Sequence, residues 1–198
     1  MERMATLSRK TKETEIELTL QLDGGDVDIS TGVGFFDHML TSFAVHGGFG
    51  LRLKADGDWH VDCHHTVEDV GIVLGSAFRK ALGDRAGLVR YGNAYIPMDE
   101  ALAFCAVDVS GRAYLVFNAE FPQERVGDFD SCMAEEFFRA FSTRAGITLH
   151  LSCLYGKNAH HMIEALFKAA AHALCDATAE NGTGAPLSTK GSLDDPEF

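Results

Sequence analysis

Positive charge is scarce in this chain. The 198 residues include 17 Lys and Arg against 29 Asp and Glu, which gives a formal net charge of −12 and a pI near 5.1. A surface this acidic repels the phosphates of nucleic acids and anionic lipids, so neither nucleic acid nor a membrane is expected as a partner. Any cluster of basic residues is informative for the same reason, because few such residues are available to form one.

Cysteine is sparse as well and shows no disulfide pattern. The five cysteines are an odd number, they are scattered, and no two are spaced C-x-x-C; they are Cys63, Cys105, Cys132, Cys153 and Cys175. We therefore predict buried thiols in a reducing cytosol rather than a disulfide framework.

Long apolar stretches are missing. No apolar run approaches the length of a membrane span, and the segment from Met1 to Lys12 is polar, without the apolar core of a secretion signal. We therefore expect a cytoplasmic protein. The chain is nevertheless 46% hydrophobic, which suffices for a sizeable core in one domain or in two small fused halves.

One five-residue pattern, His-His-x-x-Glu, occurs twice, at residues 64–68 and 160–164. Each copy opens an apolar segment with helical periodicity. Imidazoles and carboxylates in this arrangement are ligands for a divalent metal. A helix N-terminus with solvated imidazoles is the common interpretation of a single His-His pair, but two copies with matched Glu favour metal binding.

Apolar periodicity predicts a similar order of elements in both halves of the chain. The first half is predicted to contain strands over 16–22, 51–55 and 58–62 and helices over 35–45 and 64–82. The second half is predicted to contain strands over 101–109, 112–121 and 147–154 and helices over 134–144 and 160–179. The segment from Asn181 is rich in Gly, Ser and Pro and is expected to be mobile.

The spacing of these elements indicates an internal duplication. The long helices are offset by 96 residues (160 − 64), and the glycines that end the shorter ones, Gly48 and Gly146, by 98 (146 − 48). The offset of the shorter helices also pairs His38 with Glu136. We predict an α+β fold made of two α/β halves, each a small mixed sheet with two helices on one face.

The predicted organisation is one compact domain built from these halves. Residues 1–92 form the first half, residues 93–180 the second, and residues 181–198 a flexible C-terminal tail.

Helical geometry limits which ligands share an ion. Residues four apart lie on one face, so His64 and Glu68 can hold one ion, and the equivalent pair of the second copy can hold another. Neighbouring residues are about 100° apart around the axis, so His65 and His161 must each reach a different ion. The symmetric solution exchanges them and groups His160, Glu164 and His65 at one ion and His64, Glu68 and His161 at the other. His38 and Glu136 can each complete one of these sites.

Four nitrogen and oxygen ligands per ion, without a thiolate, suit a six-coordinate ion with two open positions. This favours Mn²⁺ or Fe²⁺ over a closed tetrahedral zinc site. The pattern is not H-E-x-x-H, so a zinc protease is not indicated. Among the other histidines, His46 is as consistent with capping the first helix as with a functional role, and His60, His150 and His172 are expected to be structural or at the surface.

Eight short stretches, distributed in order along almost the whole chain, carry a resemblance to a known family. They are RKTKET at 9–14, GFFDHML at 34–40, DCHHTVED at 62–69, MDEAL at 98–102, DVSGR at 108–112, RVG at 125–127, GKNAHHMIEALFK at 156–168 and STKG at 188–191. With these stretches the chain closely resembles the imidazoleglycerol-phosphate dehydratases of histidine biosynthesis. The resemblance implies a hydro-lyase with a fold like that of ribosomal-protein domain 2.

The resemblance also implies two manganese ions per active site. It assigns one ion to His38, His65, His160 and Glu164, and the other to His64, Glu68, His161 and the residue at position 136. Many members have His at that position, whereas this chain has Glu136. A carboxylate oxygen can still bind manganese and is a harder ligand than imidazole; the alternative is that Glu136 is solvated and a water takes its place.

The reaction implied by the family removes water from D-erythro-imidazoleglycerol phosphate and yields imidazole acetol phosphate. The proton to be lost lies on an unactivated carbon. Binding of an imidazole nitrogen to a divalent cation acidifies the ring. The resulting imidazolate expels hydroxide and forms a diazafulvene-like intermediate, in which the next C–H is acidic, and the enol product tautomerises to the ketone.

Family position assigns further roles. Glu13 is the expected general acid and base, with a solvated strand carboxylate as the alternative, and His46 is expected to contact the substrate hydroxyls. The catalytic residues are then Glu13, His46, Glu68 and Glu164. Arg90, Arg112 and Lys168, with Ser188 and Lys190 of the tail, are expected to bind the substrate and its phosphate, because phosphate requires cationic donors. The complete predicted substrate set is Glu13, His38, His46, His64, Glu68, Arg90, Arg112, His160, Lys168, Ser188 and Lys190.

At the level of assembly, the family implies a large octahedral homo-oligomer of trimers with active sites between subunits, and manganese is expected to drive its formation. A dinuclear metallohydrolase and a non-catalytic metal-storage shell are the alternatives. Asp99 and Glu100 lie in a matched stretch without an assigned role.

Overall fold

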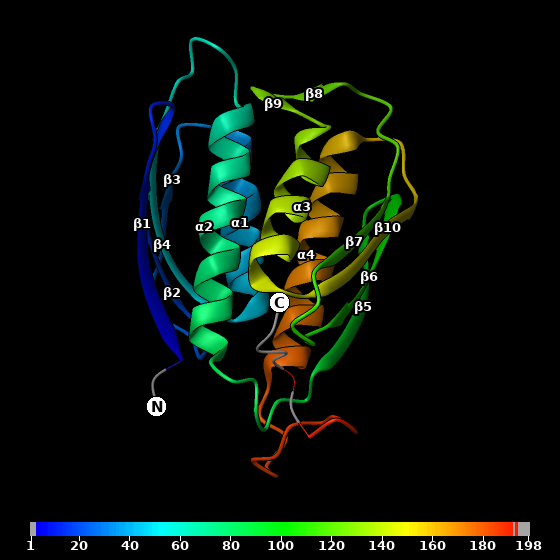
Figure 1. Cartoon of the computed structure of the whole chain (residues 1–198). Helices are drawn as coiled ribbons and strands as arrows, with labels where there is room; N and C mark the ends of the chain where they lie inside the picture. The colour runs from blue at the N-terminus through cyan, green and yellow to red at the C-terminus, as the bar shows by residue number, and fades with distance from the viewer. Residues whose placement is uncertain (1–2, 192, 194–198) are drawn as a thin grey trace.

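A layer of helices lies between two β-sheets in the computed structural model, which describes residues 3–191 and 193 (Figure 1). The first sheet has the order β1-β2-β4-β3, with β1 Met4–Lys10, β2 Thr14–Gln21, β4 Gly50–Gly57 and β3 Val27–Ser30. The second has the order β5-β6-β10-β7, with β5 Tyr91–Met98, β6 Ala101–Asp108, β10 Thr148–Tyr155 and β7 Tyr114–Asn118. The helices are α1 Gly34–Gly47, α2 His64–Leu82, α3 Met133–Ala145 and α4 Ala159–Thr178, and β8 Arg125–Val126 pairs with β9 Phe129–Asp130.

The second sheet repeats the first. In each half the first two strands pair antiparallel, the second pairs antiparallel with the strand before the long helix, and that strand pairs in parallel with an edge strand. The equivalent helices also end alike, because Gly48 and Gly146 both adopt the left-handed conformation, with φ of 67° and 66°. The predicted α+β fold with duplicated halves is confirmed.

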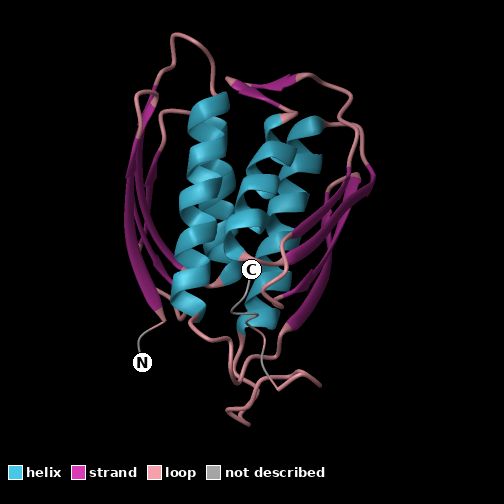
Figure 2. Ribbon diagram, in the orientation of Figure 1, coloured by secondary structure: helices cyan, strands magenta, loops and turns pink. Residues whose placement is uncertain are grey.

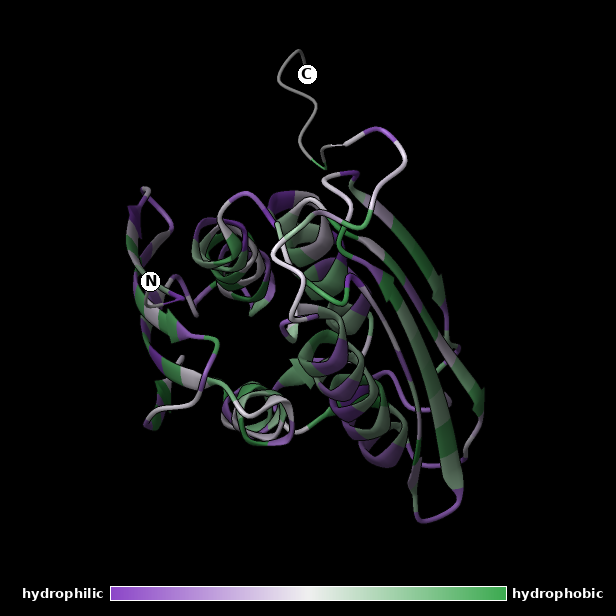
Figure 3. Cartoon of the chain, turned by 90° about the horizontal axis from the view of Figure 1, so that it is seen from below, coloured by the Kyte–Doolittle hydropathy of each residue, from purple (hydrophilic) through white to green (hydrophobic). Residues whose placement is uncertain are grey.

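Alternating burial explains why the sheets face the helices. In β2 the side chains of Ile16, Leu18 and Leu20 are buried, whereas Glu15 and Glu17 are exposed. Each sheet therefore presents one apolar face to the helix layer and one polar or partly exposed face outward. Figure 2 shows the helices enclosed between the two sheets, and Figure 3 shows the same arrangement viewed from below.

The helices pack in pairs that join the two halves. Helix α1 packs against α4, and α2 packs against α3, so each pair takes one helix from each half. Aromatic rings fill the contacts between the two halves: Phe78 of α2 meets Phe141 of α3 edge to face at 5.2 Å between ring centroids, and Phe36 of α1 meets Phe137 of α3 at 5.5 Å. The core is thus shared by the halves rather than divided between them.

The strand predicted over residues 58–62 is wrong. The segment is a loop between β4 and α2, with Trp59 N bonded to Gly57 O and Val61 N bonded to Asp58 O. The side chain of Asp62 accepts a hydrogen bond from the backbone N–H of His64. This local bond favours a turn before α2 over pairing with a neighbouring strand. Strands β1, β3 and β5 were not predicted, and β7 is shorter than the predicted 112–121.

Glycines set the distance between α2 and α3, and this leads to a prediction about stability. A Cβ atom at Gly71 would lie 2.8 Å from the carbonyl oxygen of Phe137, and one at Gly75 would clash with the carbonyl oxygen of Phe141. We expect Gly75→Ala to lower the free energy of unfolding by about 1–3 kcal/mol, because the helices must move apart. Gly34→Ala is the control, since nothing lies within 4 Å of a Cβ there. Equal urea midpoints for the two variants would contradict the prediction.

None of the helices in the described residues is both long and apolar enough to cross a membrane.

The tail is described as far as residue 191 and at residue 193, and the rest of the predicted mobile segment lies outside the described residues. Residues 181–191 run beside the segment after α2: Asn181 donates from its side chain to Leu88 O, and Gly87 N bonds to Ala185 O.

Candidate active site

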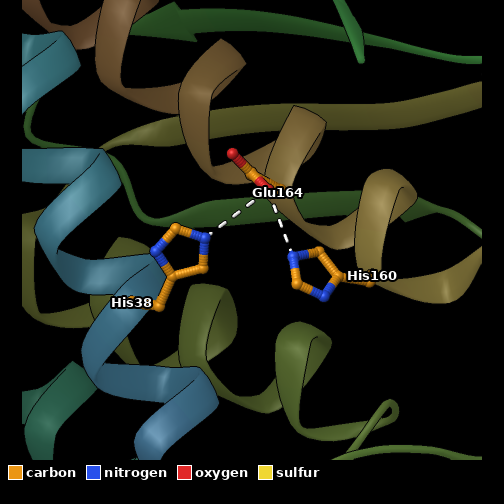
Figure 4. Close-up of side chains that lie close together, drawn as sticks. All are labelled: His38, His160 and Glu164. Atoms are coloured by element: carbon orange, nitrogen blue, oxygen red, sulfur yellow. Dashed lines mark ion pairs between the residues drawn. The ribbon is translucent and has the colours of Figure 1, made fainter. Parts of the chain in front are cut away.

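Two helices from different halves bring three predicted ligands together. His38 lies on α1, and His160 and Glu164 lie on the first turns of α4 (Figure 4). Helix α4 begins at Ala159 because the side chain of Asn158 accepts a hydrogen bond from the backbone N–H of His160. The i, i+4 spacing then places His160 and Glu164 on one face, and the packing of α1 against α4 adds His38.

The geometry of this trio fits a divalent metal. Glu164 Oε2 lies 3.6 Å from His38 Nε2 and 3.3 Å from His160 Nε2, and all three donor atoms lie within 4.8 Å of one another. Adjacent donors around an ion with bonds of about 2.1 Å are roughly 3 Å apart, so a small inward movement suffices. In the part of the chain that the structure describes, no other group of three His, Cys, Asp or Glu donors is this close.

The two oxygens of Glu164 have different partners. Oε2 faces the imidazoles, whereas Oε1 binds Lys168 Nζ at 2.6 Å. The carboxylate side chain is only 8% exposed, but the imidazoles of His38 and His160 are 52% and 40% exposed. The carboxylate of Glu164 is therefore the buried side of the cluster. The imidazole side is open to solvent, where further ligands can approach.

The negative charge of the Glu164 carboxylate is stabilised by its neighbours. Burial alone would raise the pKa of the Glu164 carboxyl, but the hydrogen bond and charge of Lys168, aided by His38 and His160, outweigh burial and lower the pKa. Glu164 is therefore ionised at neutral pH, as a metal ligand must be.

The equivalent positions of the other half are less closely assembled. His64 Nε2 and Glu68 Oε2 are 4.0 Å apart on α2. Glu136 lies on α3, the helix that packs against α2, in the position equivalent to His38 on α1. Its carboxylate oxygen is 4.0 Å from Arg139 Nε on its own helix. Among the described residues, His64 and Glu68 thus form a pair rather than a group of three donors, and ligation by Glu136 stays a prediction.

The second histidine of each motif points to different partners. His65 Nδ1 contacts Asp58 at 3.0 Å, and its Nε2 is 3.9 Å from Glu13 Oε1. His161 Nδ1 contacts Glu100 at 2.7 Å, and its Nε2 is 3.6 Å from Asp99 Oδ2. Neither imidazole joins the trio of its own chain.

These contacts raise the pKa of both histidines. The hydrogen bond that His65 donates to Asp58 is the main cause of the raised pKa of His65, and the bond that His161 donates to Glu100 is the main cause of the raised pKa of His161. The same bond from His161, with backbone N–H groups, lowers the pKa of Glu100 to about 2. Asp58 and Glu100 had no assigned role in the sequence, because the first lies in a loop and the second at a hairpin turn.

Of the predicted phosphate residues, Lys168 binds Glu164 in the trio, whereas Arg90 and Arg112 lie together at a different place. Arg90 binds Asp108 through Nε at 2.7 Å and Nη2 at 3.1 Å, and Arg112 reaches the same carboxylate at 3.4 Å. A third nitrogen of Arg90 donates to Leu187 O of the tail at 2.5 Å, which brings the segment with Ser188 and Lys190 alongside. Asp108 therefore holds both arginines, and Arg90 connects this group to the tail.

This basic group is remote from the metal trio within one chain. Arg90 directly precedes β5, whereas Met98 at the other end of β5 contacts Lys168, the partner of Glu164. An extended strand of this length spans about 25 Å. The three-carbon glycerol chain of the substrate that the resemblance implies joins an imidazole to a phosphate. It cannot bridge such a distance, because each bond adds only about 1.5 Å.

One more pair of histidines connects α1 and α4. His46 Nδ1 is 3.3 Å from His172 Nε2. Burial, followed by the charge of Lys168 and then of His172, lowers the pKa of His46. His172 was predicted to be structural or at the surface, but its spacing of two i+4 steps from Glu164 through Lys168 is a signal that could have placed it on this face.

Comparison with known proteins gives consistent matches. A family model described as imidazoleglycerol-phosphate dehydratase matches residues 31–174. A relative of that name from Bacillus cereus is 58% identical over 188 residues, covering 93% of this chain and 96% of the relative. A crystal structure of imidazoleglycerol-phosphate dehydratase from Staphylococcus aureus matches with a TM-score of 0.82 and 44% identity over 89% of this chain and 99% of that one. A crystal structure of the enzyme of that name from Pyrococcus furiosus matches with a TM-score of 0.82 and 37% identity, covering 94% of this chain and 99% of that one.

Proposed function

The chain belongs to the imidazoleglycerol-phosphate dehydratase family of hydro-lyases, and we propose that it dehydrates D-erythro-imidazoleglycerol phosphate to imidazole acetol phosphate in histidine biosynthesis. The observation that carries the proposal is the buried Glu164 carboxylate between two imidazoles that come from different halves. A hydro-lyase acting on an imidazole requires a cation at the ring, and this trio is suited to hold one.

Two divalent ions, with Mn²⁺ as the preferred metal, complete the proposed site. His38, His65, His160 and Glu164 would hold one ion, and His64, Glu68, Glu136 and His161 the other. Bound ions supply Lewis acidity that makes the imidazole ring of the substrate acidic, as a route through an imidazolate and a diazafulvene-like intermediate requires. Nitrogen and oxygen donors without thiolate fit such an ion.

The protein's own groups then bind and orient the substrate and move protons. Lys168 keeps Glu164 ionised and places a cation next to it. The carboxylate of Glu13 lies beside His65, a proposed ligand, where it can exchange protons with a substrate held there. We propose that His46 on α1 contacts the substrate hydroxyls.

We propose that complete sites form between subunits of a large homo-oligomer. His65 and His161 do not reach the trio of their own chain, so they can serve ions held mainly by another chain. Arg90 is about 25 Å from the trio along β5, so it too can serve only a substrate whose imidazole is held mainly by another chain. A substrate held by both groups must therefore contact more than one chain. A cytoplasmic location stays a prediction.

A turnover assay with a chelation control tests the proposal. Purified full-length protein with Mn²⁺ should convert imidazoleglycerol phosphate to a ketone, and chelation should abolish turnover and lower the sedimentation coefficient, because the ions hold chains together. Absence of ketone from the metal-loaded assembly would refute the dehydratase assignment. Competition by imidazole analogues separates this activity from a dinuclear hydrolase, and turnover itself excludes a storage shell.

A further inference from the structure

The second histidine of each His-His-x-x-Glu motif has its Nδ1 on a carboxylate that lies outside its own helix. His65 Nδ1 is 3.2 Å and 3.0 Å from the two oxygens of Asp58. His161 Nδ1 is 2.7 Å from Glu100 Oε2. The same arrangement therefore occurs twice, once in each half, although the carboxylates come from different elements.

The two carboxylates are held in place by the fold. Asp58 lies in the loop between β4 and α2, and its side chain is only 15% exposed. Glu100 lies at the turn between β5 and β6, and its Oε1 accepts hydrogen bonds from the backbone N–H groups of Lys157 at 3.0 Å and Asn158 at 2.8 Å. Glu100 therefore connects this turn to the segment that starts α4, and its other oxygen is aimed at His161.

An ionised carboxylate can only accept hydrogen bonds, and a neutral imidazole has one N–H and one lone pair. A carboxylate at Nδ1 therefore places the proton on Nδ1 and leaves the lone pair on Nε2. The Nε2 atoms of His65 and His161 are 3.9 Å and 3.6 Å from Glu13 and Asp99, distances longer than a hydrogen bond. In the trio, too, it is Nε2 of His38 and His160 that faces Glu164.

We propose that Asp58 and Glu100 are positioning residues that fix the tautomer and ring orientation of His65 and His161, so that each imidazole presents Nε2 to a metal ion. The inference deepens the proposed function and rests on it for the presence of the metal. Carboxylates that orient a metal-binding imidazole in this way also increase its basicity, and their loss weakens metal binding about 10- to 100-fold.

The first arm of the test requires no substitution. Full-length, metal-free protein labelled with ¹⁵N at histidine is studied by NMR at a pH where the imidazoles are neutral. We expect His65 and His161 to show the tautomer with the proton on Nδ1. The tautomer with the proton on Nε2 would overturn the proposal, whatever the variants do.

The second arm measures Mn²⁺ affinity of the full chain by electron paramagnetic resonance of the free ion. Asp58→Ala and Glu100→Ala should each bind Mn²⁺ about 10- to 100-fold more weakly. Asp58→Asn should recover part of the affinity, because its amide oxygen still accepts the Nδ1 proton. Glu17→Gln, on the exposed side of β2, removes the same charge elsewhere and should leave affinity unchanged.

Circular dichroism establishes that each variant is folded. If Asp58 and Glu100 only stabilise the loop and the turn, their alanine variants will change thermal stability and bind Mn²⁺ as tightly as the wild type. That result would overturn the proposal. Turnover by the wild-type enzyme is measured in parallel. Wild-type protein that binds Mn²⁺ without producing ketone would refute the proposed reaction, while the tautomer and affinity results would still decide the role of Asp58 and Glu100.

Discussion

Replacing Glu164 by Gln should lower kcat/KM by about a thousandfold or more. The amide is neutral, so it removes the charge that faces His38 and His160 and that Lys168 stabilises from the other oxygen. A metal that polarises a substrate contributes several kcal/mol to transition-state stabilisation, and each 1.36 kcal/mol is a factor of about ten in rate. Steady-state kinetics with saturating Mn²⁺, together with Mn²⁺ affinity, measure both consequences.

Glu15→Gln is the matched control for this substitution. Glu15 binds Lys10 at 2.6 Å, the same distance as between Glu164 and Lys168, but this pair lies on the exposed side of the first sheet. It should leave activity within about twofold of the wild type, because exposed ion pairs contribute little. Activity of Glu164→Gln close to that of Glu15→Gln, with native circular dichroism for both, would remove Glu164 from the site.

Replacing Phe137 by Ala should lower the free energy of unfolding by about 3–5 kcal/mol. Phe137 is fully buried on α3 and contacts Phe167 of α4 and Phe36 of α1, so its ring holds helices of both halves. Truncation removes the transfer free energy of the ring and leaves a cavity that packed helices cannot fill. Urea denaturation of the metal-free protein measures the effect without a contribution from metal-driven assembly.

Phe137→Leu is the control, since leucine keeps most of the apolar volume and should lose clearly less stability than alanine. An alanine variant with the urea midpoint of the wild type would mean that the helix layer does not depend on this ring.

The helices were predictable because their apolar faces repeat at helical spacing along one segment. The predicted helix over 64–82 coincides with α2. Strand β1 was missed because it is an edge strand in which Ala5 is buried but most side chains are polar and accessible. Strand β5 contains Gly92 and Pro97, which do not indicate a strand by themselves.

The site was predictable only where its residues share a helix or follow from the duplication. The spacing of His160 and Glu164 placed them on one face, and the 98-residue offset (146 − 48) paired His38 with position 136. The contacts of Asp58 and Glu100 with the motif histidines could not be predicted, because they depend on where a loop and a turn lie after folding. The remoteness of Arg90 from Glu164 likewise follows from the course of β5 and not from any local pattern.

The pairing of α1 with α4 and of α2 with α3 means that each half contributes one member of each helix pair. Neither half can therefore cover its helices alone, and rings such as Phe78 are packed against the other half. Two separate copies of one half would carry the same residue at equivalent positions. One continuous chain carries no such restriction, and it has His38 on one helix and Glu136 at the equivalent position of another.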